Sequence, residues 1–270
     1  MVAKLLKLVP PHREYVEPFG GGASLLLAKA PARVETYNDL DSALVGFFRV
    51  LADPRLFKRF YRRVQATPYS RELYNQYREE WQAEEDPVIR VYKWFVVARM
   101  SFGGRFGGGF GTAVSESCRR MAETCSKWLS IIDMLPEIHH RLMCVQIENA
   151  DWRMVLDRYV VGSSTFVYLD PPYIPETRRS GGYKHELTAE DHKDLVDRLL
   201  RCPAQCMLSG YASDIYKPLE EAGWERIDWV TVCHAAGRTR HTKIQGKGAA
   251  MSKQKRVESV WLKVNSKGLF

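Results

Sequence analysis

The sequence lacks a long apolar run. No stretch of its 270 residues approaches the ~18 consecutive apolar residues that a membrane-spanning helix needs. Residues 1–11 contain lysines, but they have neither an apolar core nor a small-residue cleavage site, which argues against a secretory signal. We therefore expect a cytoplasmic protein with no membrane partner.

Cysteine is sparse, and none of the six cysteines forms a Cys-x-x-Cys pair. That spacing is typical of structural zinc sites, so its absence argues against a zinc ribbon, and no metal is expected. A chain of this length buries enough apolar surface to fold without disulfides, so we expect reduced thiols.

Acidic residues are fewer than basic ones. The chain has 40 Lys and Arg against 32 Asp and Glu, which gives a formal net charge of +8. A basic excess favours anionic partners, nucleic acid first, although many basic proteins bind no polyanion. Apolar residues make up 45% of the chain, which excludes a wholly disordered protein.

Two kinds of segment follow one another along the chain. Residues 1–50 and 145–270 alternate short β-branched runs with helical patterns and glycine turns, which predicts an α/β sheet. Strands are expected at 14–19, 33–37, 165–169, 205–209, 225–232 and 257–264, and helices at 23–29 and 190–201. The pattern Thr188-x-x-Asp191 is typical of an N-cap before the second of these helices.

Residues 51–144 differ from the rest. Helical periodicity is present at 53–65, 71–84, 88–99 and 117–135, with no convincing strand between these segments. We interpret 51–144 as a helical insertion in the α/β domain. The exception is 101–111, whose six glycines exclude a stable helix and predict a loop or hairpin.

The motif Asp170-Pro171-Pro172-Tyr173 follows the apolar strand expected at 165–169. It is therefore expected at the carboxyl edge of the sheet, where open α/β sheets bind ligands. Two prolines restrict the backbone and remove two N–H donors, so the turn is rigid and presents acceptors. A carboxylate, a carbonyl and an aromatic ring held together suit a planar substrate with an amino group. A plain surface turn is the alternative.

A glycine turn and an acid follow the first two expected strands. In Glu17-Pro18-Phe19-Gly20-Gly21-Gly22, the glycines let a ligand approach the backbone, although a plain strand-to-helix turn fits equally well. The segment is neither a P-loop nor Gly-x-Gly-x-x-Gly. Asp39 is placed to accept hydrogen bonds from two ribose hydroxyls, or to form an Asx turn. Together they suggest a nucleoside-containing cofactor without a triphosphate.

The ordered motifs resemble those of the Dam-type (alpha-class) DNA adenine-N6 methyltransferases of bacteria and their phages. The likeness spans nearly the whole chain, and its further segments are Asn149–Trp152, Tyr173–Arg178, Leu208–Tyr211 and Arg256–Trp261. It implies a Rossmann-like methyltransferase sheet with an inserted helical target-recognition domain at 51–144. It also implies methyl transfer from S-adenosylmethionine to the exocyclic amino nitrogen of a flipped-out adenine in double-stranded DNA.

The resemblance assigns roles to residues of this chain. Catalysis falls to Asp170, Pro171, Pro172 and Tyr173. Cofactor binding falls to Glu17, Pro18, Phe19, Gly20, Gly22, Asp39, Asp151 and Trp152, with Asp39 on the ribose and Asp151 on the cofactor adenine. The expected DNA contacts are Arg105, Arg178, Lys184, Arg238, Arg240 and Lys243.

The predicted DNA contacts also have alternative interpretations without a role in DNA binding. Arg105 lies on the glycine loop, where the family carries a base-reading hairpin, but the loop can equally be a plain connection. Residues 229–257 hold seven Lys or Arg and no acid, which favours a basic arm over a solvated loop. The basic helix expected at 53–65 fits phosphate binding and a solvated face equally well.

One segment departs from the family pattern. The family usually opens with Gly-Gly-Lys, which helps hold the methionine part of the cofactor, whereas this chain begins Met1-Val-Ala-Lys4. We expect a truncated start or weaker cofactor binding, with Lys4 or Lys7 as the substitute.

Four other functions stay open at this point. They are methylation of cytosine, RNA adenine or a protein glutamine, and a DNA-binding relative that has lost catalysis. Asp170 argues against cytosine and glutamine enzymes, which more often carry Ser or Asn there. A restriction endonuclease partner also stays open, and we expect a monomer or weak dimer.

Overall fold

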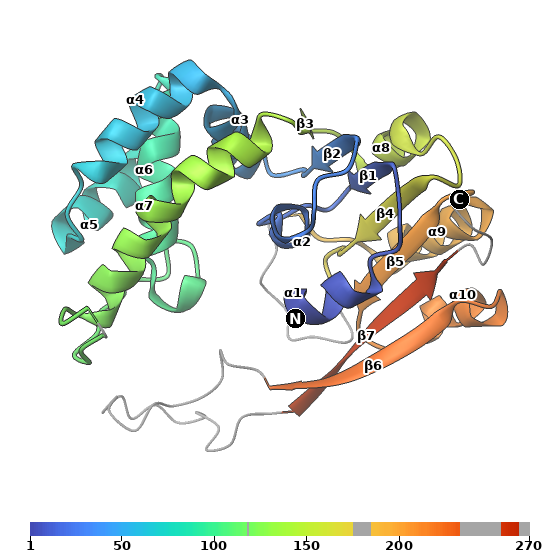
Figure 1. The fold of residues 1–270 in the computed structure, drawn as a ribbon. Coiled ribbons are helices and arrows are strands. Elements are labelled where there is room, and N and C mark those ends of the chain that lie inside the picture. Colours follow the sequence, from blue (N-terminus) through green and yellow to red (C-terminus); the bar gives the residue numbers. More distant parts are fainter. Residues whose placement is uncertain (118, 175–184, 233–254, 265–270) are drawn as a thin grey trace. The chain divides into compact units, whose positions relative to one another are not determined.

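The computed structural model describes residues 1–117, 119–174, 185–232 and 255–264 (Figure 1). The chain divides into two compact units. One consists of Met1–Asn38 and Ala150–Phe270, and the other of Asp39–Asn149. The chain therefore leaves the first unit after its second strand and returns to it before the Asp170–Tyr173 motif.

The first unit is built on a mostly parallel sheet. Its strands are β1 (Glu14–Glu17), β2 (Val34–Asn38), β4 (Thr165–Leu169), β5 (Gln205–Gly210), β6 (Glu225–Val232) and β7 (Lys255–Lys263). They lie in the order β2-β1-β4-β5-β7-β6. The first four are parallel, whereas β7 runs antiparallel to both β5 and β6. This is the predicted Rossmann-like methyltransferase sheet.

Helices cover the sheet of the first unit (Figure 1). They are α1 (Val2–Leu5), η1 (Leu6–Leu8), α2 (Ser24–Ala28), α8 (Trp152–Tyr159), α9 (Ala189–Arg201), η4 (Asp214–Tyr216) and α10 (Lys217–Glu221). Every residue of β4 and β5 is buried, as expected for central strands covered on both faces. Apolar side chains of α8, α9 and α10 join those of β4 and β5 in one core. Each large apolar side chain buried there contributes about 1.5–3 kcal/mol.

Local sequence signals predicted the elements of the first unit well. All the strands and helices expected there agree with the structure to within two residues. The capping pattern that begins with Thr188 is confirmed: its hydroxyl accepts a hydrogen bond from the Asp191 amide at 3.1 Å. The Asp191 carboxylate in turn accepts one from the Thr188 amide at 2.9 Å.

The second unit is helical. It contains α3 (Ser42–Ala52), α4 (Pro54–Gln65), α5 (Arg71–Glu80), α6 (Pro87–Met100), η2 (Phe102–Gly104), α7 (Glu123–Leu142) and the short strand β3 (Gln146–Glu148). Asp41, Asp53 and Asp86 cap α3, α4 and α6 by accepting hydrogen bonds from first-turn amides. In the parts of the chain that the structure describes, no helix is long and apolar enough to cross a membrane.

The helix expected at 117–135 is displaced toward the C-terminus. The structure has α7 at Glu123–Leu142, so the prediction was wrong at both ends. Before the helix, Glu116 and Ala122 form an isolated antiparallel bridge. After residue 135, the helix continues through Pro136, which removes a backbone hydrogen bond and costs about 3 kcal/mol. Burial of His139 and Leu142 on the continued helix face offsets that cost.

The glycine-rich segment forms a closed loop, as predicted. The Gly111 amide donates to the Met100 carbonyl, and the Phe102 amide donates to the Gly109 carbonyl, each at 2.7 Å. The hydroxyl of Tyr74, on α5, accepts a hydrogen bond from the Gly109 amide at 3.0 Å. The base of the loop is thereby attached to the helices, while Arg105 is exposed.

The second unit begins earlier than the predicted insertion. We expected the insertion at 51–144, but α3 packs against α4, α6 and α7, so residues 39–50 belong with the helices. The role of this unit in target recognition stays a proposal.

The turn from β1 to α2 lies against β2. The Gly20 amide donates to the Asn38 carbonyl at 2.8 Å, and the Tyr37 hydroxyl donates to the Gly21 carbonyl at 2.8 Å. A Cβ atom on Gly20 would lie 2.1 Å from the Tyr37 ring, which is itself fully buried. Glycine is therefore required at position 20 by close packing.

Gly20→Ala should destabilise the first unit by about 2 kcal/mol or more, because the buried ring cannot move away from the new methyl group. Gly22→Ala is the matched control, since a Cβ at Gly22 has only the Ser24 hydroxyl, at 3.8 Å, within 4 Å. Its effect should stay within about 0.5 kcal/mol. Urea unfolding followed by circular dichroism measures both, and equal stabilities of the two variants would contradict the packing argument.

Candidate active site

A buried side-chain amide joins three segments of the first unit. The Asn38 amide nitrogen, at the end of β2, donates to the Pro18 carbonyl at 2.8 Å and to the Ala150 carbonyl at 3.0 Å. Its oxygen accepts a hydrogen bond from the Ala150 amide at 2.9 Å. Asn38 is only 1% exposed. The glycine turn, the end of β2 and the start of α8 are thus held together at one edge of the sheet.

Asn38, the residue before Asp39, was not among the residues predicted from the sequence to form the site. The signal available was a polar amide directly after a strand of buried residues. An amide has two donors and one acceptor group, so it can satisfy two segments at once. Its partner at residue 150 lies too far along the chain for any local pattern to indicate it.

Asp39 follows Asn38 directly. Its Oδ1 atom accepts a hydrogen bond from the Asp41 amide at 2.8 Å, so the Asx turn considered as an alternative is present. The Asp39 side chain is half-buried. An Asx turn uses one lone pair of a carboxylate that offers several, so the turn is compatible with a second role in ribose binding.

The segment Asp151-Trp152 begins α8. An Asp151 oxygen accepts a hydrogen bond from the Arg153 amide at 2.9 Å, which makes Asp151 the N-cap of the helix. Trp152 is 4% exposed and belongs to the core, where its ring lies 5.8 Å from that of Phe19. Phe19 and Trp152 therefore lie side by side, and the indole serves mainly as packing in the core.

The motif Asp170–Tyr173 lies directly after β4. Val167 pairs with Val16 of β1, and Leu169 pairs with Leu208 of β5, so Asp170 lies at the carboxyl edge beside the end of β1. Pro171 and Ile174 are buried and anchor the turn. The ring of Tyr173 lies edge-on to that of Tyr211, with 4.6 Å between the ring centroids.

Acidic groups from three strands interact at this edge. Burial and, to a smaller extent, the charge of Asp170 raise the pKa of Glu17, while the 3.0 Å hydrogen bond from the Tyr15 hydroxyl opposes the rise, and the net value is about 8. Burial and, second, the charge of Glu258 on β7 raise the pKa of Asp170, to about 6 in total. Asp170 is itself exposed, so its rise reflects the density of protein around the carboxylate rather than loss of all contact with water.

This set of carboxylates suits an organic cation. Within the described ranges, no group of three or more His, Cys, Asp or Glu is arranged to hold a metal ion. Above the glycine turn there is open space, since a Cβ on Gly21 would meet no atom within 4 Å. Backbone that a ligand can approach, acids for hydroxyl and amino groups, and a negative field together fit the parts of S-adenosylmethionine.

Some predicted residues cannot be placed. Arg178, Lys184, Arg238, Arg240 and Lys243 lie outside the described residues. Of the predicted DNA contacts, the structure describes Arg105 alone, on the glycine loop of the second unit.

Comparison with known families decides between the alternatives left open by the sequence. The family model of the D12 class N6 adenine-specific DNA methyltransferases matches residues 1–232. The chain belongs to this family. The predicted resemblance, the fold class and site-specific methylation of adenine in DNA are thereby confirmed, and the D12 family uses S-adenosylmethionine. No curated protein matches the methyltransferase closely enough to serve as a relative.

Glu17→Gln should stabilise the methyltransferase at neutral pH. The folded-state pKa of Glu17, about 8, lies above the ordinary value of 4.5, so the folded state favours the protonated acid. The stability of the folded state therefore falls as the pH rises from 4.5 to 8. Glutamine removes this cost, which amounts to about 3 kcal/mol at pH 7.

The gain should vanish well below pH 4.5, where Glu17 is protonated in both the folded and the unfolded state. Thermal unfolding across this pH range measures it. The exposed Glu225 on β6 supplies the control, since Glu225→Gln should change little at either pH. A gain for Glu17→Gln that is the same at both ends of the range would contradict the assigned cause.

Proposed function

We propose that Asp170, Pro171, Pro172 and Tyr173 carry the methylation of an adenine that has been turned out of the DNA duplex. The observation that supports this most is the interaction between Asp170 and Glu17 across the adjacent strands β4 and β1. It brings the Asp-Pro-Pro-Tyr turn to the same edge as the glycine turn. A base paired inside a duplex cannot reach such an edge, so the target must leave the stack.

The adenine amino nitrogen needs activation because its lone pair is delocalised into the ring. On this proposal, the Asp170 carboxylate and the Pro171 carbonyl each accept one N–H of the amino group. The nitrogen then becomes pyramidal and its lone pair points toward the methyl donor, so positioned acceptors supply most of the rate gain. The cofactor contributes a methyl group on a positively charged sulfur. Tyr173, supported by Tyr211, stacks on the base.

Protonation of Asp170 matters for this step. Its pKa of about 6 leaves it ionised at neutral pH, when it accepts hydrogen bonds. Nitrogen that has gained a methyl group must lose a proton, and a carboxylate with a raised pKa is a better acceptor for it than an ordinary aspartate.

We assign the cofactor to the edge held by Asn38. The backbone of the glycine turn after Glu17 contacts the cofactor. Asp39 accepts hydrogen bonds from the ribose hydroxyls, and Asp151 accepts one from the adenine amino group. The Asp170 carboxylate, which is ionised at neutral pH, provides a negative charge near the cationic methionine end.

The second unit is proposed to contact DNA. Its helix α4 carries five cations and no acid, and all five side chains are exposed. Arg55, Lys58 and Arg62 follow one another at spacings of three and four, so they form one stripe opposite the buried Phe57 and Phe60. Such a stripe suits a phosphate backbone. Arg105, exposed on the glycine loop, is proposed to read a guanine in the major groove.

Asp170→Ala should lower the methylation rate by at least about a hundredfold, because one of the two acceptors on the amino group is lost. Binding of S-adenosylmethionine should weaken at most about threefold, since the exposed Asp170 contributes only its charge, and no hydrogen bond, to the cofactor. Transfer of labelled methyl groups to DNA measures the rate, and calorimetry measures binding.

Asp39→Asn is the matched control for this pair of measurements. Asparagine keeps the hydrogen bond to the Asp41 amide but loses one acceptor for the ribose, so cofactor affinity should fall about tenfold. Methylation by Asp170→Ala at the wild-type rate would remove the acid from the mechanism.

Replacing Arg55, Lys58 and Arg62 together by Gln should weaken DNA binding and its salt dependence. If each contacts one phosphate, the slope of log K against log salt should flatten by about 2.7. A control triple variant, Lys127→Gln, Lys193→Gln and Lys217→Gln, removes the same charge from scattered exposed positions. Equal slopes for the two variants would show that α4 is only a solvated face.

A further inference from the structure

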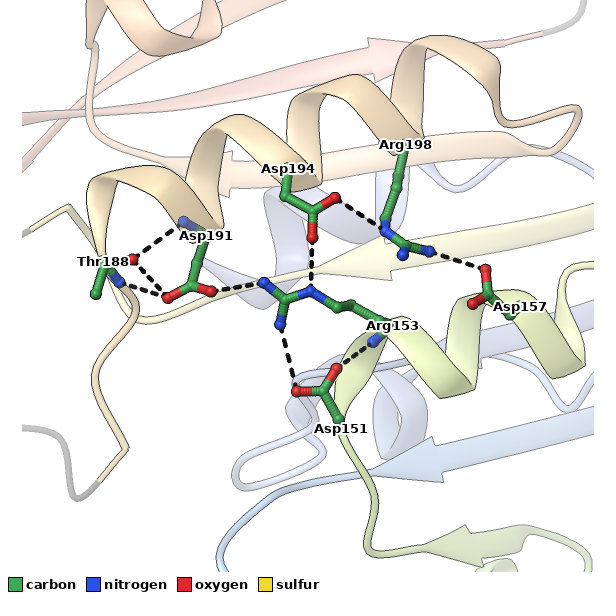
Figure 2. A network of polar contacts seen from close by, with 7 residues as sticks. All are labelled: Asp151, Arg153, Asp157, Thr188, Asp191, Asp194 and Arg198. Carbon is green, nitrogen blue, oxygen red and sulfur yellow. Dashed lines mark hydrogen bonds and ion pairs between the residues drawn. The ribbon is translucent and has the colours of Figure 1, made fainter.

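Arg153, the second residue of α8, is the centre of a network of charges (Figure 2). Its Nε atom lies 2.6 Å from an Asp194 oxygen, its Nη2 atom lies 2.6 Å from Asp191, and its Nη1 atom lies 3.3 Å from Asp151. Each nitrogen of the guanidinium therefore faces a different carboxylate. Asp191 and Asp194 belong to α9, whereas Asp151 is the N-cap of α8 itself.

The network holds the guanidinium in one orientation. Its plane lies over the Trp152 ring, with the Arg153 Cζ atom 4.3 Å from the ring centroid. Asp191 is also part of the capping box of α9, and its pKa is held at about 2 by hydrogen bonds from Thr188 and Arg153. Asp191 and Trp152 are thus constrained by groups other than Arg153. The planar guanidinium of Arg153, which lies between them, therefore has little freedom to rotate.

A second arginine forms the outer half of the network. Arg198 donates to the other oxygen of Asp194 at 3.1 Å and to Asp157 at 2.9 Å (Figure 2). Both arginines join α8 to α9, and their side chains are equally exposed, at 29%. They differ in one respect that bears on the site: only Arg153 has a contact with Asp151 in the network.

We propose that Arg153 is a positioning residue, which sets the carboxylate of Asp151 for the adenine end of S-adenosylmethionine. This inference rests on the proposed function, which assigns Asp151 to that group. Asp151 receives two hydrogen bonds from the same residue, one from the Arg153 amide and one from its guanidinium. Together they determine where the remaining lone pairs of the carboxylate point.

Without the guanidinium, Asp151, Asp191 and Asp194 would lose the cation that lies among them. Like charges at short distance repel, so Asp151, the one of the three not on α9, would turn away and its acceptor geometry would be lost. A lysine would restore the charge but not the planar set of N–H donors, because one ammonium cannot face three carboxylates in the same geometry.

Arg153→Gln should weaken binding of S-adenosylmethionine about tenfold, measured by calorimetry on the full chain. The KM for the cofactor should rise by the same factor while kcat at saturation is retained, because Arg153 does not touch the target base. Arg153→Lys should recover part of the affinity. Arg198→Gln, the matched control, breaks ion pairs between the same helices and should bind the cofactor as the wild type does.

A double-mutant cycle with Asp151→Asn tests the route of the effect. If Arg153 acts through Asp151, Arg153→Gln should cost nothing further in the Asp151→Asn background. Thermal unfolding of each variant measures the structural contribution separately. The unfolding temperature should fall by a similar amount in Arg153→Gln and Arg198→Gln.

Three results would overturn the inference while leaving the proposed function intact. They are wild-type cofactor affinity in Arg153→Gln, an equal loss of affinity in Arg198→Gln, and independent effects of Arg153→Gln and Asp151→Asn. Failure of the wild-type chain to bind S-adenosylmethionine would instead contradict the proposed function, and the inference with it.

Discussion

The proposed cofactor site depends on the hydrogen bonds of one buried amide. Asn38 satisfies the Pro18 carbonyl and both backbone groups of Ala150, and it has almost no contact with water. A buried amide that loses a partner costs about 1–3 kcal/mol, so the three segments keep one relative geometry. Each of them leads directly into residues assigned to the cofactor: Phe19 and Gly20, Asp39, and Asp151.

The parallel pairing of β1 and β4 then places acids where they oppose folding. Glu17 is held in a buried position that favours its protonated form, and Asp170 is held beside both Glu17 and Glu258. A chain selected for stability alone would carry neutral residues there. Perturbed carboxyl groups gathered at a sheet edge are typical of functional sites, which agrees with the methylation activity of the family.

The sequence predicted what short-range patterns encode. The strand at 165–169 and the cap at Thr188 follow from apolar runs and local spacing, and the glycine turn follows from its composition. The partners of Asn38 and Arg153 lie 112 and 38 residues away in the chain, and no periodicity connects them. The course of α7 through Pro136 was missed because tertiary packing outweighs the local preference of proline. The candidate catalytic and cofactor residues came from the ordered motifs, whereas the raised pKa values of Glu17 and Asp170 depend on neighbours that only the fold brings near.

The two ends of the proposed cofactor site differ in their electrostatics. Asp151 is paired with Arg153, so its charge is balanced and it can recognise the neutral adenine by hydrogen-bond direction. At the other end, burial raises the pKa values of Glu17 and Asp170, and the charges of Asp170 on Glu17 and of Glu258 on Asp170 add to the rise. A ligand with one cationic and one neutral end lowers the free energy of this arrangement in a single orientation, with its cation near β4. On the proposed assignment, that orientation would bring a sulfonium methyl near Asp170, where the transfer to the adenine amino group is proposed.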